Sequence, residues 1–198
     1  MNSPIVINLS GPPGAGKSTA AANVFSSLKQ LGINAELVTE YAKDKTWESN
    51  AKALGCQEYV FGKQSYKMAR CRDEVDVIVV DSPLPLSLIY NHNPALDHHF
   101  EQVVMNVFNT YENLNFYINR VKAYNPKGRN QTAQEIDALG EEIKELYSRL
   151  GINYITINGN KRGHKQIINT FIDTYGYKFN IKRRKTLWYW LCTIVTKR

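Results

Sequence analysis

Residues 11–18 read Gly-Pro-Pro-Gly-Ala-Gly-Lys-Ser and fit the pattern G-x-x-x-x-G-K-[S/T] in full. Glycines let the backbone curl so that several N–H groups point at one phosphate chain. A helix that begins near Lys17 adds the positive end of its dipole. Lys17 is placed to reach the β- and γ-phosphates, and the Ser18 hydroxyl to bind Mg²⁺. We therefore predict a site for ATP and Mg²⁺ built from Gly11, Pro12, Pro13, Gly14, Ala15, Gly16, Lys17, Ser18 and Thr19. The alternative is a glycine-rich turn that binds no ligand.

Two acidic residues follow predicted strands. The apolar run 35–39 ends at Glu40, and the β-branched run 75–80 ends at Asp81. In open parallel sheets, ligands bind at the carboxyl ends of the strands. We expect Asp81 to hold Mg²⁺ or accept a proton, and Glu40 to lie where an acceptor substrate is held. Tyr41, Lys43, Asp44 and Trp47 follow Glu40, and we expect residues 41–47 to form a loop with a functional role. The alternative is a solvated charged loop.

Two later segments also have the composition of ligand-binding loops. Residues 120–131 are basic and rich in turn formers, so we expect a lid in which Arg120 and Arg129 close over the triphosphate. The alternative is a solvated basic loop. Asn158 and Gly159 follow a predicted strand at 154–157 and form an expected place for adenine.

These functional residues require a framework of alternating strands and helices. Apolar runs predict strands at 5–9, 35–39, 75–80, 114–118 and 154–157. Helical periodicity over 19–31, 57–72, 98–111, 132–150 and 164–175 predicts helices between and after them. This alternation indicates an α/β fold with three layers, α/β/α, around a parallel sheet of about five strands.

The 198 residues suit one domain, which we place at residues 1–178, followed by a basic aromatic tail at 179–198. The tail has three interpretations: a contact with nucleic acid, a contact with a membrane surface, or an element packed on the core. The net charge of +7 is compatible with nucleotides or nucleic acid as ligands. Three widely spaced cysteines, no leader-like segment and no apolar run of about 20 residues favour a cytoplasmic location without a membrane span.

The chain resembles the P-loop nucleoside and nucleotide kinases, in particular those similar to thymidylate kinases. The resemblance extends to about residue 175 and rests on residues 11–18, Glu40, Asp81-Ser82-Pro83, the basic segment and Asn158-Gly159. It implies that Glu40 or Asp81 prepares the acceptor hydroxyl and that Arg120 and Arg129 are lid arginines. Two positions depart from the pattern: Ser82-Pro83 stand where many members carry an arginine, and Tyr41 replaces the usual proline.

Within this family the chain looks most like divergent kinases of bacteriophages. One group of these phosphorylates 5-hydroxymethyluracil within DNA, so the resemblance implies an acceptor hydroxyl on a nucleotide, either free or in DNA. The basic lid and tail are then candidate DNA contacts. In the host, such a protein would be cytoplasmic.

Two other functions remain open from the sequence. The first is a nucleotide-dependent switch or assembly ATPase, in which water accepts the phosphate. The second is a DNA-binding module with a vestigial nucleotide site, although an intact Lys17, Ser18 and Asp81 argue against it.

Overall fold

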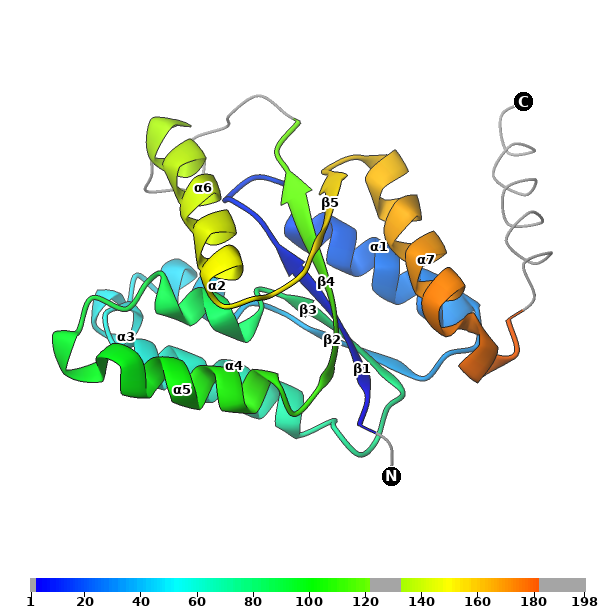
Figure 1. The fold of residues 1–198 in the computed structure, drawn as a ribbon, viewed down its shortest axis with the longest axis horizontal. Coiled ribbons are helices and arrows are strands. Elements are labelled where there is room, and N and C mark those ends of the chain that lie inside the picture. The colour runs from blue at the N-terminus through cyan, green and yellow to red at the C-terminus, as the bar shows by residue number, and fades with distance from the viewer. Residues whose placement is uncertain (1–2, 122–132, 182–198) are drawn as a thin grey trace.

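The structure is a computed structural model that describes residues 3–121 and 133–181. Its centre is a sheet of five parallel strands in the order β2-β3-β1-β4-β5 (Figure 1). The strands are β1 (Ile5–Ser10), β2 (Ala35–Val38), β3 (Val77–Asp81), β4 (Glu112–Asn119) and β5 (Ile155–Asn158). The predicted α/β fold and the five strands are confirmed, because near-continuous apolar runs suit strands that are covered on both faces.

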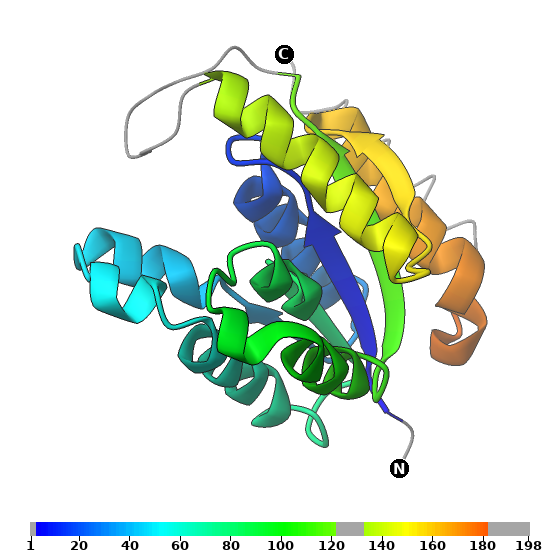
Figure 2. The same ribbon diagram turned by 60° about the vertical axis from the view of Figure 1, so that its left-hand side comes forward.

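Helices cover both faces of the sheet. The described helices are α1 (Lys17–Gln30), α2 (Tyr41–Trp47), α3 (Ala51–Leu54), α4 (Gln57–Ala69), α5 (Asp97–Phe108), α6 (Ala133–Arg149) and α7 (Lys161–Tyr175), with 3₁₀ turns η1 (Leu84–Leu88), η2 (Pro94–Leu96) and η3 (Gly176–Phe179). Figures 1 and 2 show α1 and α7 on one side of the sheet, and α4, α5 and α6 on the other. None of the described helices combines the length and apolar character needed to cross a bilayer.

Alternation along β1 divides the core between the two faces. Ile5, Ile7 and Leu9 pack in the core beneath α1 and α7, whereas Val6 points to the core beneath α4 and α5. Asn8 is also buried on that second face, where its amide donates to Asn113 Oδ1 at 2.8 Å and Asn115 Oδ1 at 2.9 Å. These two bonds tie β1 to β4 and satisfy a polar group that would otherwise be costly to bury.

The order of the strands fixes where a ligand can bind. β1 lies between β3 and β4, with Leu9 in register with Asp81 and Ser10 in register with Tyr117. The chain leaves β1 toward β2 at one edge and later crosses to β4 on the opposite side. Such a switch point leaves a crevice beyond the carboxyl ends of the strands. Residues 11–18, called the phosphate loop below, start there.

One local prediction was wrong. Residues 41–47 were expected to be a loop, but they form α2. A helix of seven residues is too short to be stable alone or to give a clear periodic pattern. Contacts with α4 stabilise it: the Tyr41 N–H donates to Gln64 Oε1 at 2.9 Å, and Lys67 pairs with Asp44 at 3.3 Å. The sequence carries no local signal of these contacts.

Candidate nucleotide-binding site

The phosphate loop has the backbone conformation that its sequence requires. Gly11, Gly14 and Gly16 have φ angles of 140°, 78° and 97°, which place them in the region that favours glycine. Gly16 is the N-cap of α1, so the positive end of that helix faces the loop. Lys17 Nζ folds over the loop and donates to Gly11 O at 2.9 Å. The arrangement can bind an anion through backbone N–H groups, a helix terminus and one ammonium group.

Close backbone contacts hold the phosphate loop on both sides. A Cβ added to Gly11 would lie 2.6 Å from Ile118 O in β4, so this position excludes any side chain. A Cβ added to Gly159 would lie 1.9 Å from Ala15 O in the loop. The Gly159 N–H also donates to Asn119 O at 2.9 Å. The segment predicted to hold adenine therefore lies directly against the phosphate loop.

Asp81 is the last residue of β3 and lies beside β1 just ahead of the loop. Its side chain is buried, and Oδ1 has no hydrogen-bond partner among the described residues. A buried carboxylate oxygen without a partner is unfavourable unless a cation or water binds it. The next residue, Ser82, has φ 100°, an unusual conformation outside glycine that concentrates at functional sites. Together with the Ser18 hydroxyl, Asp81 is suited to bind Mg²⁺, which prefers oxygen ligands.

Glu40 lies two residues after β2 and is the N-cap of α2. Burial raises the pKa of its carboxyl, and Lys17 opposes this change by lowering the pKa. The charge of Asp81 raises the pKa further, and that of Lys43 lowers it. Because such effects require proximity, Glu40, Asp81 and the two lysines belong to one electrostatic cluster. The carboxylates of Glu40 and Asp81 thus influence each other electrostatically.

Lys43 is a site residue whose role the sequence did not predict. Its Nζ lies 3.4 Å from Ser18 Oγ, the hydroxyl that we expect to bind Mg²⁺. Lys43 reaches the loop because it lies one helical turn after Glu40 in α2. Had residues 41–47 been predicted as a helix, this spacing would have placed the lysine beside Glu40.

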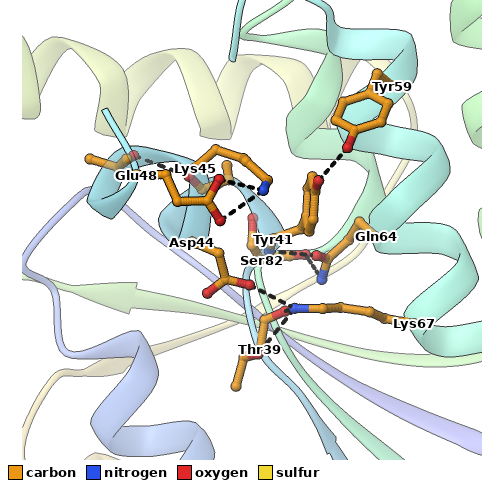
Figure 3. A network of polar contacts seen from close by, with 11 residues as sticks. Thr39, Tyr41, Asp44, Lys45, Glu48, Tyr59, Gln64, Lys67 and Ser82 are labelled. Atoms are coloured by element: carbon orange, nitrogen blue, oxygen red, sulfur yellow. Dashed lines mark hydrogen bonds and ion pairs between the residues drawn. The ribbon is translucent and has the colours of Figure 1, made fainter. Parts of the chain in front are cut away.

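The residues on both sides of Glu40 in the chain take part in a network of polar contacts between α2 and α4 (Figure 3). Gln64 is buried; its Oε1 accepts from the Tyr41 N–H at 2.9 Å, and its Nε2 donates to Ser82 O at 3.4 Å. Lys67 donates to Thr39 O at 3.2 Å. Gln64 thus links the backbone of the residue after Glu40 to the backbone of the residue after Asp81.

The segment after β3 brings a tyrosine to the same region. Burial raises the pKa of Tyr90 to about 12, and the nearby charges of Glu40 and Glu142 act in the same direction. Tyr90 lies two residues after η1, and its side chain is still 37% exposed.

The predicted lid is described only in part. Arg120 follows β4, and its Nη2 donates to Asp137 Oδ1 of α6 at 2.6 Å. Its guanidinium is thus bound to the first turns of α6 in this structure. Arg129, like the basic tail, lies outside the described residues. The structure therefore brings together the phosphate loop, Glu40, Asp81 and Gly159, and it pairs Arg120 with a carboxylate.

Comparison with known proteins identifies one family. A family model described as an AAA domain matches residues 6–164, which include the phosphate loop, Glu40, Asp81 and Gly159. A comparison with curated protein sequences finds no match.

Among solved structures, the chain is similar to the APS kinase CysC of Mycobacterium tuberculosis in complex with AMPPNP and APS. This similarity has 13% identity and a TM-score of 0.48, and covers 86% of this chain and 97% of that one. A cysteine-to-alanine mutant of the same enzyme aligns with 18% identity and a TM-score of 0.40, over 75% of this chain and 99% of that one.

Proposed function

The chain belongs to the AAA domain family, and we propose that it is a kinase that uses ATP and Mg²⁺ to phosphorylate a hydroxyl of a nucleotide-type acceptor. The observation that carries this proposal is the position of Glu40. Binding and hydrolysis of a triphosphate need the phosphate loop and one carboxylate for the metal, which Asp81 supplies. A second, partly buried carboxylate with a raised pKa, beside Lys17 and Lys43, is the group expected where an acceptor hydroxyl is held.

In the proposed reaction, the acceptor oxygen attacks the γ-phosphorus while the bond from that phosphorus to the β–γ bridging oxygen breaks. The acceptor proton passes to the Glu40 carboxylate, and ADP leaves. Ser18 and Asp81 would hold Mg²⁺, which neutralises charge on the β- and γ-phosphates when bound. Catalysis by this chain is then mostly positioning and electrostatic stabilisation.

Lys43 extends the resemblance drawn from the sequence. Many of the deoxynucleoside and thymidylate kinases that the sequence resembles carry an arginine after the aspartate of the third strand, where this chain has Ser82 and Pro83. Lys43 enters the same region from α2 and lies against Ser18. We assign it the cationic role of the missing arginine, together with Lys17. Arg120 would act with these two lysines if its guanidinium left Asp137 and bound the triphosphate instead. Arg129 is a second candidate for a lid arginine.

The finer proposal is 5-hydroxymethyluracil in DNA as the acceptor, with free nucleosides and nucleoside monophosphates as the alternative. Incubation with γ-labelled ATP and separate pools of nucleosides, monophosphates and hydroxymethylated DNA tests both. We expect label in one pool and none with Lys17→Ala. If no pool is labelled while ATP is hydrolysed, the protein is instead a switch-type ATPase.

A further inference from the structure

Positive charge is concentrated on the helices beside Glu40. Residues 41–72, which contain α2, α3 and α4, carry seven basic and three acidic residues. The rest of the described chain carries nine basic and fifteen acidic residues. The two sets thus have balances of +4 and −6, and the residues outside the described ranges carry the further +9 that makes the net charge of the chain +7. The excess of positive charge on these three helices is suited to an extended anion.

Exposed aromatic side chains gather on the same helices. Trp47 is 73% exposed, Tyr66 is 67% exposed, and Tyr59 is 39% exposed. Of the exposed aromatic residues in the described chain, only Tyr90 and Tyr177 lie elsewhere. Large exposed aromatic groups are unfavourable in water, so a cluster of them marks a surface where something binds.

The aromatic and basic side chains form a continuous stripe on α4. Tyr59, Lys63, Tyr66 and Arg70 follow one another at helical spacing and are exposed, while the opposite side of α4 packs against the core. Lys63 Nζ lies 5.6 Å from the Tyr59 ring centroid. The eleven steps from Tyr59 to Arg70 give the stripe a length of about 16 Å, which is long enough to contact more than one nucleotide of an unpaired strand.

The stripe also continues to the reaction centre. The hydroxyls of Tyr59 and Tyr41 are 2.6 Å apart (Figure 3), and Tyr41 is the residue after Glu40. Lys45 Nζ lies 5.3 Å from the Tyr41 ring centroid. A chain bound along α4 would therefore reach the Glu40 carboxylate across Tyr41. Figure 2 shows α2 and α3 projecting from the body, which leaves this side open to a long ligand.

We propose that the outer surface of α2 and α4 binds single-stranded nucleic acid, with Tyr66 and Trp47 stacking on bases and Lys63 contacting phosphate. Aromatic platforms interleaved with basic residues are the general solution for binding unpaired strands, because every base has a face to stack on. As a consequence that rests on the proposed kinase function, the acceptor hydroxyl arrives within a polynucleotide rather than on a free nucleotide. An anionic membrane or an acidic protein would use the charge but has no bases to stack.

Fluorescence anisotropy with a short fluorescein-labelled oligothymidylate tests the surface directly. The full-length protein is titrated in EDTA without ATP, at several salt concentrations. We expect Tyr66→Ala and Trp47→Ala each to weaken binding about fivefold or more, with little change in salt dependence. Lys63→Ala should instead lower the slope of log K against log salt by about 0.7, the value of one phosphate contact.

Matched controls lie on the opposite side of the fold. Tyr177 is 75% exposed, so Tyr177→Ala removes a comparable tyrosine and should leave affinity unchanged. Lys29→Ala is the control for Lys63→Ala, because it also removes one positive charge, at the end of α1. It should leave the slope of log K against log salt unchanged. Equal losses in the Tyr66 and Tyr177 variants, or none in either, would overturn the proposal. The proposal would also be overturned if Tyr66→Ala weakened binding to anionic vesicles but not binding to the oligonucleotide.

The binding assay is independent of catalysis. Lys17→Ala, which disables the proposed triphosphate site, should bind the oligonucleotide like the unchanged protein. Stacking-dependent binding without phosphoryl transfer would refute the kinase but not the surface. Transfer to free nucleotides with no stacking-dependent binding would refute the surface alone.

Discussion

Gly159→Ala is the smallest change that should disable the phosphate loop. The added Cβ would lie 1.9 Å from Ala15 O, 3.0 Å from Ala15 C and 3.1 Å from Asn119 O. All three neighbours are backbone atoms, so no side chain can rotate away. Ordinary contact begins at 3.4 Å, and the phosphate loop and the segment after β5 must therefore separate by about 1.5 Å.

Both the phosphate loop and the segment around Gly159 are anchored, so the added Cβ must strain or displace the loop. The Gly159 N–H is bound to Asn119 O at 2.9 Å, and the Asn160 side chain caps α7 by accepting from the Gly163 N–H at 3.0 Å. A misplacement of about 1 Å at a reacting centre costs roughly 10²-fold in rate. Overpacking of a well-packed region costs about 1–3 kcal/mol in stability. We expect Gly159→Ala to weaken ATP binding, to slow phosphoryl transfer about 10²-fold and to unfold at a lower urea concentration.

Gly62→Ala is the matched control. Gly62 lies inside α4, and a Cβ added there meets nothing within 4 Å. Alanine is favoured over glycine in a helix by about 0.5–1 kcal/mol, so this variant should be more stable and bind ATP normally. Calorimetric titration with ATP and urea unfolding measure both effects. Unchanged ATP affinity and stability in Gly159→Ala would refute the contact on which this reasoning rests.

Three further predictions concern the charged groups of the site. Burial raises the pKa of Glu40 above its ordinary 4.5, so the folded state binds this proton more tightly than the unfolded state and loses stability as the pH rises through the raised value. Glu40→Gln should therefore increase the free energy of unfolding at neutral pH, measured in urea, while it abolishes phosphoryl transfer. A lower free energy of unfolding in this variant would contradict the reasoning. Lys43 lowers the pKa of Glu40, so Lys43→Met should shift the rising limb of the pH–rate profile to higher pH and reduce phosphoryl transfer by roughly 10²-fold. Lys45→Met removes the 2.6 Å pair with Glu48 and the contact with the Tyr41 ring but leaves Lys43 in place, so it should do neither. Arg120→Ala should slow phosphoryl transfer. Asp137→Ala removes the carboxylate that binds Arg120 and leaves the arginine in place, so it should not slow transfer. Equal rates of phosphoryl transfer in the two variants would exclude Arg120 from the reaction.

The sequence predicted much of the fold because its signals are local. Apolar runs identify the five strands, and Gly11, Lys17 and Ser18 identify the phosphate loop. The ends of β2 and β3 then mark Glu40 and Asp81, since parallel strands end at one edge of the sheet. These features need no knowledge of which segments meet in space.

What could not be predicted depends on contacts between distant segments. The strand order places β3 beside β1 through packing of both faces, which no single segment encodes. α2 is held by Gln64 and Lys67 from α4, so its sequence was interpreted as a loop and the position of Lys43 was missed. The need for glycine at 159 comes from Ala15, which lies far away in the chain.

The central claim is that Glu40 accepts the proton of an acceptor hydroxyl beside a phosphate loop that binds ATP. A single turnover with γ-labelled ATP, followed by separation of labelled acceptor from inorganic phosphate, tests it most directly. The account predicts that the unchanged protein places the label on the acceptor, and that Glu40→Gln binds ATP with the same affinity but labels no acceptor. Release of all label as inorganic phosphate at equal rates in both proteins would contradict it.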